Sequence, residues 1–421
     1  MPCCPEPDLN PTTLNPAHAK ADTPDHLRPR GSSQGGLRQY NERVVLQALR
    51  LHGALPAAEL ARLTHLTAQT ISMITKRLLD DGLLRKGQPV RGKVGQPSVP
   101  LSLNPDGAFS IGIKLGRRSL DVLLLDFAGA VRERWAIAYD FPDPDAVLPE
   151  IAQRLQDIRS LLGPARSERL QGIGIAAPLQ LSAWRELLGA DAAVAAKWDR
   201  VDLRAAVEAL SGLPVHLLKD TAAACVAELV AGRGRALTGF LYVFVDTFIG
   251  GGLVLDSHLR AGLNGNAGAI GSLPMGLSQT GEPPAQLLGV ASLLNLERAW
   301  AAGGLATDVA GDERALQDPW ASLTRAWLAQ AGAAVALAVN SAACLLDLEA
   351  VVLDGSFSPA LRGALQAAVQ SALNGYDWRG VVRPAVLPGT IGSDARALGG
   401  ALLPLYANFA PDRDLFLKVA A

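Results

Sequence analysis

The chain has 421 residues, of which 49% are hydrophobic and 19% are charged. This length exceeds that of one small domain, and the apolar content supplies sizeable cores and excludes a mostly disordered protein. The 39 basic and 40 acidic residues leave a net charge of -1, so the total charge indicates no particular partner.

Charge is unevenly distributed along the chain. Residues 36–104 contain ten basic and four acidic residues, a net charge of +6, whereas residues 105–421 contain 26 basic and 32 acidic residues, a net charge of -6. A small basic module on a larger acidic body favours a polyanion as the partner of the module. A chance excess of solvated Lys and Arg side chains is the alternative.

Residues 1–35 are rich in Pro, Asp, Ser and Gly without apolar periodicity, which predicts a disordered tail. The tail contains no apolar segment of a signal peptide, and the four cysteines include neither a disulfide framework nor a C-x-x-C metal pair. The most apolar stretch, Ala331–Leu346, contains Asn340 and Ser341 and falls short of the roughly 20 residues that span a bilayer. We therefore expect a cytoplasmic protein without a membrane segment.

Apolar periodicity predicts three helices in the basic segment. The first ends near Gly53, the second covers Pro56–Leu63, and the third follows the N-cap Thr67 and stops at Gly82. Three helices joined by short turns are typical of a helix-turn-helix, whose third helix would read DNA.

The third helix has a core face of Ile71, Ile74 and Leu78. The residues that point away from this face are Ala68, Gln69, Thr70, Ser72, Met73 and Lys76. Gln pairs bidentately with adenine, and small neighbours allow close approach to the bases. A solvated helix face is the alternative. The candidate DNA-binding residues of this helix are Thr67, Gln69, Thr70, Ser72, Lys76 and Arg77.

Two short segments, Leu83–Lys86 and the apolar Val99–Leu103, flank a basic loop with several glycines. Two strands around such a loop predict a wing, which completes a winged helix-turn-helix over residues 36–104. Arg91 and Lys93 in the loop would neutralise phosphates or enter a narrow minor groove.

From residue 105 onward, predicted strands and helices alternate in two cycles. The predicted strands are Phe109–Ile113, Leu120–Leu125, Leu170–Ala176, Val215–Leu218, Phe240–Val245, Gly250–Leu255, Ala350–Leu353 and Val381–Val386. Two successive α/β units indicate two lobes with a cleft between them. We place the first lobe at residues 105–235, completed by a C-terminal helix at 395–421, and the second at 236–394.

Several motifs of this body occur in an order and spacing that are specific together. They are Gly172-Ile173-Gly174-Ile175-Ala176-Ala177-Pro178, Gly212-Leu213-Pro214-Val215, Lys219-Asp220-Thr221-Ala222-Ala223-Ala224, Ile249-Gly250-Gly251-Gly252 and Ala267-Gly268-Ala269-Ile270-Gly271. With the winged helix, they resemble the ROK family of repressors, open reading frames and kinases over about residues 37–418. The resemblance implies a two-lobed α/β ATPase fold, actin/hexokinase-like (ribonuclease H-like), behind a winged helix-turn-helix.

The ATP-binding positions depart from the pattern of a ROK kinase. Such a kinase carries Asp-x-Gly-Gly-Thr-Lys at the first strand turn, where the acid helps to hold magnesium and the glycines admit phosphates. This chain has Lys114-Leu115-Gly116-Arg117-Arg118-Ser119, so a cation replaces the acid and two arginines replace Gly and Thr. In the second phosphate loop, Asp246 adds negative charge and Phe248 adds bulk. We expect no cofactor and no phosphoryl transfer.

The sugar-binding positions of the family also differ here. An Asn-Asp pair is replaced by Lys219-Asp220, while the Glu and His of a later motif match Ala269 and Ser272. The region of the family's zinc loop, 276–288, contains no cysteine or histidine, so no metal is expected.

Asp220 corresponds to the catalytic base of the family, which takes the proton of the sugar hydroxyl. We expect it to cap the following helix instead, because a lone base without ATP-binding loops cannot run the reaction. Asp220 is thus a vestigial candidate, and the catalytic set is empty. The candidate ligand-binding residues are Lys219, Asp220 and Asn266.

The wing departs from the family as well. ROK repressors usually carry Gly-Arg-Pro there, whereas this chain has Gly95-Gln96-Pro97. Gln96 would still read groove-edge acceptors, but the missing charge shifts affinity towards Arg91 and Lys93.

We therefore predict a sequence-specific DNA-binding transcriptional regulator, a repressor, whose kinase-like body is inactive and serves oligomerisation and small-molecule sensing. The expected partners are double-stranded DNA with an inverted-repeat operator, a second copy in a homodimer or tetramer, and a sugar or another small-molecule effector. Two alternatives stay open: an active ROK sugar kinase with Asp220 as base, and a protein-binding regulatory scaffold.

Overall fold

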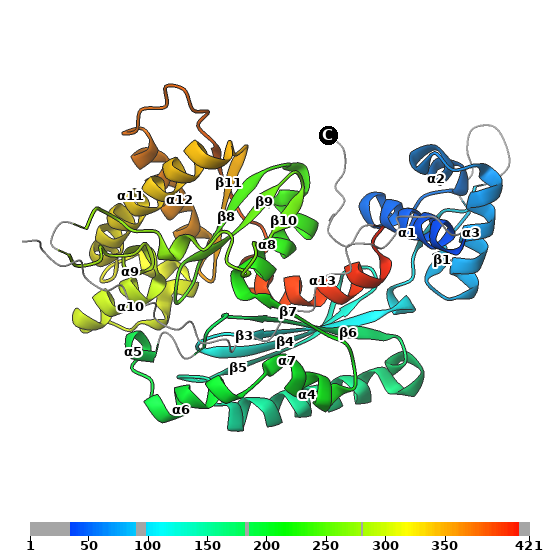
Figure 1. Ribbon diagram of the computed structural model, residues 1–421, viewed down its shortest axis with the longest axis horizontal. Helices are drawn as coiled ribbons and strands as arrows, with labels where there is room; N and C mark the ends of the chain where they lie inside the picture. The colour runs from blue at the N-terminus through cyan, green and yellow to red at the C-terminus, as the bar shows by residue number, and fades with distance from the viewer. Residues whose placement is uncertain (1–33, 90–97, 182–184, 279–280, 412–421) are drawn as a thin grey trace, which may run out of the picture. The chain divides into compact units, whose positions relative to one another are not determined.

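The computed structural model describes residues 34–89, 98–181, 185–278 and 281–411 (Figure 1). The predicted tail, the wing residues Arg91, Lys93 and Gln96, and residues 412–421 of the predicted last helix lie outside the described residues. The chain divides into two compact units, Met1–Tyr40 and Asn41–Ala421. Only residues 34–40 of the first unit, the start of a helix, are described.

The basic segment folds into three helices and a two-stranded sheet. Their bounds are α1 (Gln34–His52), α2 (Ala57–Thr64), α3 (Ala68–Asp80), β1 (Leu84–Lys86) and β2 (Leu101–Leu103). β1 and β2 pair in antiparallel fashion, and a bridge between Leu55 and Leu101 ties the turn after α1 to β2. Leu60, Ile71 and Leu78 are buried in the core of this module, as the periodicity predicts.

The first lobe is built on a five-stranded sheet in the order β5-β4-β3-β6-β7. The strands are β3 (Phe109–Leu115), β4 (Ser119–Asp126), β5 (Val131–Ala138), β6 (Leu170–Ala177) and β7 (Val215–Lys219). β3, β4 and β5 pair in antiparallel fashion, whereas β6 and β7 continue the sheet in parallel with β3. Helices α4 (Pro144–Ser167) and α7 (Leu203–Ser211) cover one face, with α5 (Arg185–Leu188) and α6 (Ala192–Lys197) between them in the chain (Figure 1).

The second lobe repeats this topology in the order β10-β9-β8-β11-β12. Its strands are β8 (Phe240–Val245), β9 (Gly250–Leu255), β10 (His258–Arg260), β11 (Ala350–Gly355) and β12 (Ala385–Pro388). Its helices are α9 (Leu288–Ala291), α10 (Leu293–Ala302), α11 (Ala321–Leu346) and α12 (Pro359–Leu373). The strand directions also match those of the first sheet, so the body is a duplicated α/β unit.

Two helices, α8 (Asp220–Ala231) and α13 (Ala395–Phe409), form a layer on the other face of the first sheet (Figure 1). They approach their neighbours closely because both are rich in small residues. A Cβ atom at Gly174 of β6 would overlap the backbone of Gly400, and one at Gly399 would overlap that of Ala223. Glycine is therefore required at these crossings of α13 with β6 and α8.

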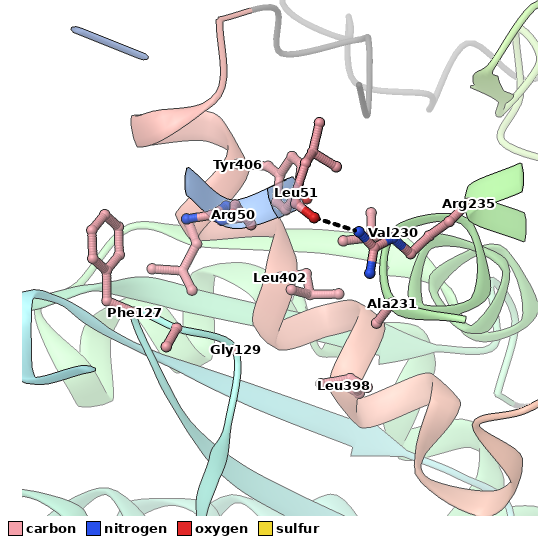
Figure 2. Close-up of a pocket in the computed structure, with 12 residues that line it drawn as sticks. Arg50, Leu51, Phe127, Gly129, Val230, Ala231, Arg235, Leu398, Leu402 and Tyr406 are labelled. Carbon is pink, nitrogen blue, oxygen red and sulfur yellow. Dashed lines mark hydrogen bonds between the residues drawn. The ribbon is translucent and has the colours of Figure 1, made fainter. Parts of the chain in front are cut away.

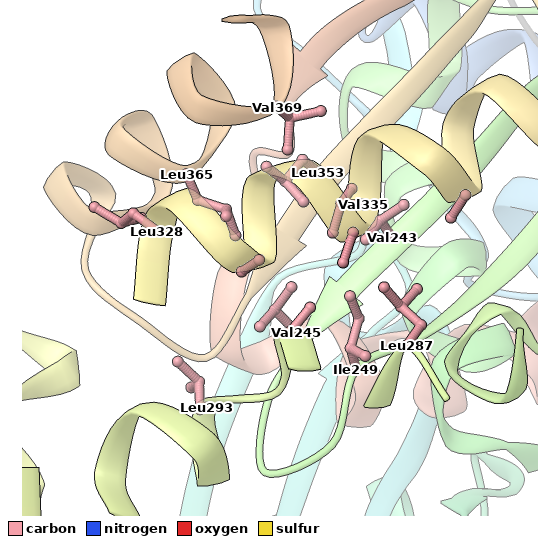
Figure 3. Packing of buried hydrophobic residues seen from close by; sticks show 14 of the residues in the cluster. Val243, Val245, Ile249, Leu287, Leu293, Leu328, Val335, Leu353, Leu365 and Val369 are labelled. Carbon is pink, nitrogen blue, oxygen red and sulfur yellow. The ribbon is translucent and has the colours of Figure 1, made fainter. Parts of the chain in front are cut away.

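α11 is the one described helix that is long and apolar enough to cross a membrane by length and composition. The helix has 26 residues, so the prediction that this stretch is too short to span a bilayer is wrong. The predicted helix at Ala331–Leu346 is confirmed, and 44% of the most apolar window of α11 is buried. Figure 3 shows Leu328 and Val335 of α11 among buried side chains of α12 and the second sheet, including Leu365 and Val243.

Some sequence-based boundaries need correction. The predicted strand Val381–Val386 begins only at Ala385, because the preceding Pro384 lacks the N–H group that a ladder requires. The strand Val131–Ala138 was not predicted, since its first half is exposed and charged and shows no apolar alternation.

Candidate functional site

The exposed face of α3 is the first candidate site. Gln69, Ser72, Met73 and Lys76 are all exposed, with Met73 at 63%. Their spacing of three and four residues places them on one side of the helix. This face presents an amide, a hydroxyl, a thioether and an ammonium group, which is the mixture needed to contact base edges and phosphates.

The other predicted residues of α3 are engaged within the module. The Thr67 side chain caps the helix: its Oγ1 accepts from the Thr70 backbone N–H at 3.2 Å and lies 2.9 Å from Thr70 Oγ1. Arg77 forms ion pairs with Glu42 at 3.1 Å and with Asp81 at 3.6 Å. These residues position the helix, and any DNA contact of Arg77 would be shared with two carboxylates.

Met73 points away from the core of the module, as the sequence predicts, but the predicted DNA-binding residues do not include it. The signal that identifies it is an apolar side chain on an otherwise polar helix face. An exposed thioether is flexible and apolar, so its chemistry is suited to contact with the methyl group of thymine.

The turn between β3 and β4 is the second candidate site, where a kinase would hold phosphates. Lys114 Nζ lies 2.6 Å from Asp121 Oδ2, and Arg118 Nη1 lies 2.5 Å from Glu297 Oε2 of α10. Arg117 Nη1 lies 3.9 Å from Asp220 Oδ2, and its guanidinium stacks 4.6 Å from the Phe248 ring centroid. Each cation that replaces the kinase motif therefore faces a carboxylate of this chain.

A fourth pair, between α13 and the end of β8, completes the cluster. Arg396 Nη1 lies 2.5 Å from Asp246 Oδ2, and only 4% of Arg396 is exposed. Burial alone would raise the pKa of Asp246, but Arg396 and Lys114 outweigh it and hold the pKa below its usual value. Burial and the Arg396 charge lower the pKa of Lys114, against the opposing effect of Asp246.

We call these eight residues the junction cluster, since they join β3, β4, β8, α8, α10 and α13. Its members are Lys114, Arg117, Arg118, Asp121, Asp220, Asp246, Glu297 and Arg396. Arg396 was not predicted, although a single arginine in an otherwise apolar helix is a usable signal for a buried ion pair.

Asp220 is buried, with 5% of its surface exposed, and faces Arg117. The predicted N-cap role is wrong in its position: α8 begins at Asp220 itself and its N-cap is Lys219. The Asp220 carboxylate still accepts the Thr221 N–H at 2.8 Å, so it satisfies one free donor of the first turn.

The structure links only two of the three candidate ligand residues. Lys219 is adjacent to Asp220, and burial lowers the pKa of Lys219. Asn266 is exposed, and no contact in the described part of the chain joins it to Asp220. Among the described residues, no group of three or more His, Cys, Asp or Glu side chains could hold a metal ion.

The glycines 250–252 serve close packing between β9 and α8. Thr221 Oγ1 donates to the Gly251 carbonyl at 2.8 Å, and a Cβ at Gly252 would lie 2.6 Å from the Cys225 Cβ. This close packing explains the run of glycines, which in a kinase would belong to a phosphate-binding loop.

Comparison with known families decides the classification of this architecture. A model of the ROK family matches residues 110–406, and a model of the MarR family matches residues 39–93. The chain belongs to the ROK family. The combination of a MarR-type module and a ROK body in one chain confirms the predicted fold class and the predicted class of ROK transcriptional regulator.

The alignments with its relatives cover different shares of the two chains. Uncharacterized protein y4fQ of Sinorhizobium fredii is 25% identical over 88% of this chain and 91% of its own length. A putative xylose repressor of Caldicellulosiruptor is 26% identical over 56% of this chain and 59% of its own length. The matched region thus spans about three fifths of that repressor.

Two solved ROK structures share the fold. A ROK family transcriptional regulator, described as a homologue of the E. coli MLC protein, aligns at a TM-score of 0.64 and 22% identity, over 90% of this chain and 98% of its own. A ROK glucokinase from Streptomyces griseus, in complex with glucose and AMPPNP, aligns at 0.55 and 21% identity, over 70% and 99%. The fold of this chain is therefore shared with a structure described as a regulator and with one described as a glucokinase.

Proposed function

We propose that this protein is a sequence-specific DNA-binding repressor whose ROK body does not transfer phosphate. The observation that carries the proposal is the exposed face of α3, with Gln69, Met73 and Lys76 on one side of a helix in a winged module. Gln69 would pair with adenine, Met73 would pack on a thymine methyl group, and Lys76 would neutralise a phosphate.

The junction cluster supports the absence of phosphoryl transfer. A bound nucleotide would have to separate Arg117 and Arg118 from Asp220 and Glu297 before its phosphates could reach them. The Asp246 carboxylate, already paired with Arg396, would repel those phosphates. A base at Asp220 would also have to give up its bonds to Arg117 and the Thr221 N–H.

We propose that the protein acts in the cytoplasm and binds an inverted repeat in DNA as a homodimer or tetramer. Two reading helices related by two-fold symmetry would contact half-sites spaced by whole turns of the duplex. A sugar or another small molecule would act as effector, without a metal or a cofactor.

The deciding experiment is sequencing of genomic fragments that the purified full chain captures. The expected result is an enriched palindromic element that Gln69→Ala no longer enriches, while Arg204→Leu on the exposed surface of α7 captures it normally. Capture without any enriched element, or enrichment that Gln69→Ala leaves intact, would contradict the proposal.

Catalysis is tested separately by measuring ATP consumption with a panel of sugars. We expect no sugar-dependent turnover above background. Turnover that disappears in Asp220→Asn would show an active kinase and overturn the second half of the proposal.

A further inference from the structure

A cavity of about 160 Å³ lies beside the last turn of α1, within the unit Asn41–Ala421 (Figure 2). Arg50 contributes to one wall, Phe127 of the turn after β4 to another, and Arg235 follows α8. Leu398, Leu402 and Tyr406, successive residues along α13, also line the cavity. This cavity is separate from the junction cluster and shares no residue with it.

Arg50 contacts two aromatic rings, and one of its donor atoms lacks a hydrogen-bond acceptor among the described residues. Its guanidinium lies 5.5 Å from the ring centroid of Phe127 and 5.1 Å from that of Tyr406. Its Nη2 atom is buried and has no hydrogen-bond partner in the described part of the chain. A buried donor without a partner is costly, and the guanidinium that carries it lines the cavity, so an anion bound there would offset part of this cost through its charge.

Among the described residues, those that line the cavity carry positive charge and no negative charge. Arg235, the second cation in the wall, donates from Nη2 to the Leu51 carbonyl at 3.3 Å, and no residue that lines the cavity is acidic (Figure 2). Asp126, next to Phe127 in the chain, is committed elsewhere, since its carboxylate binds Arg132 Nε at 2.6 Å. An anion in the cavity would therefore meet two guanidinium groups and no competing carboxylate of the lining.

The rest of the wall is apolar and the space is small. Leu398, Leu402 and Leu405 would strip water from sugar hydroxyls without replacing their hydrogen bonds, which disfavours a sugar phosphate. A cavity of about 150 Å³ accommodates benzene. We propose that this cavity binds a small organic monocarboxylate with a compact apolar body, whose carboxylate pairs with Arg50.

The site has a consequence for DNA binding, which rests on the proposed function. Arg50 belongs to α1 of the winged module, whereas Leu398, Leu402 and Tyr406 belong to the ROK body. A ligand bound between them favours one arrangement of this contact, and it changes the affinity for DNA to the extent that the DNA-bound protein has a different arrangement.

The test is calorimetric titration of the full-length protein with benzoate, cyclohexanecarboxylate and the neutral analogue benzyl alcohol. At least one carboxylate should bind saturably at one site per chain, and benzyl alcohol should bind at least tenfold more weakly. Arg50→Leu and the cavity-filling Leu398→Trp should each weaken carboxylate binding at least tenfold. The surface control Arg204→Leu should leave it unchanged.

Thermal melting of each variant verifies that it folds. If Arg50→Leu does not fold, the result for Leu398→Trp still decides the test. Equal binding of benzoate and benzyl alcohol, unchanged binding in both variants, or no binding of either carboxylate would overturn the proposal. Binding of glucose 6-phosphate in preference to both carboxylates would overturn the ligand class.

Repeating the genomic capture with saturating carboxylate then separates the two proposals. A shift in captured DNA that Leu398→Trp abolishes supports the coupling, whereas a normal isotherm with unchanged capture overturns the coupling alone. If no DNA is captured at all, the proposed function fails, and the titration still decides the ligand site.

Discussion

Breaking the buried pair between Arg396 and Asp246 from one side should cost more than removing both partners. Asp246→Asn keeps the shape of the side chain but leaves Arg396, 4% exposed, without its carboxylate. Breaking a buried ion pair in this way typically costs about 3–5 kcal/mol. Since 21% of the Asp246 side chain is exposed, water screens part of the loss, and we expect about 2–4 kcal/mol.

The double variant Asp246→Asn with Arg396→Met removes both charges, so no ionised group is left buried without a partner. We expect a coupling energy of about 2 kcal/mol between the two positions, well above the range for independent sites. Arg396→Met alone leaves Asp246 attracted by Lys114, and Asp246→Asn alone leaves Arg396 attracted by Asp220 and Asp121.

Urea unfolding of the four proteins gives the cycle directly. The matched control is Asp256 with Arg260, an ion pair of 3.0 Å in which the two side chains are 82% and 44% exposed. The same two substitutions there should couple by about 0.5 kcal/mol or less. If the cycle at Arg396 and Asp246 were no larger than this control, the junction cluster would not be held by charge, and our reasoning would be refuted.

Three further predictions concern the pH dependence at Asp246, two glycine positions and the exposed face of α3. The pKa of Asp246 is depressed in the fold, so the stabilisation by its carboxylate should be complete above the usual carboxyl pKa of about 4 and should be lost as the pH falls through the lower folded pKa. In Asp246→Asn, the midpoint of urea unfolding should therefore depend less on pH between about pH 7 and pH 3. Gly174→Ala should lower the unfolding free energy by about 3 kcal/mol or more through its clash with Gly400, whereas Gly363→Ala in α12, with open space at its Cβ, should raise it by about 0.5–1 kcal/mol. Replacing thymine by deoxyuridine in a captured element should weaken binding about fourfold per contacted methyl group, as expected for about 0.8 kcal/mol, and Met73→Ala should lose this dependence in a fluorescence anisotropy titration.

Local periodicity predicted much of the fold because burial repeats regularly in these segments. Ile71 and Leu78 recur on one face of α3, and the strand Phe240–Val245 is apolar throughout and buried on both faces. The β5 strand escaped prediction for the opposite reason, since its outer half carries charge.

The partners in the candidate sites were predictable only where they are close in the chain. Lys114 and Asp121 face each other across the β3–β4 hairpin, so their register follows from a short turn. Arg396 and Asp246 meet through tertiary packing of α13, and no spacing in the sequence brings them together. The cavity beside Arg50 likewise depends on segments that lie far apart in the chain.

The position of α13 in the chain affects how this protein can be made by a ribosome. The helix covers a face of the first sheet, yet it is translated after every strand of both lobes. Until it emerges, the nascent first lobe exposes the glycine-lined surface of β3 and β6 to the cell. We expect chaperones to bind such a surface, and we expect a product that terminates before α13 to be degraded rather than to act as a shortened regulator.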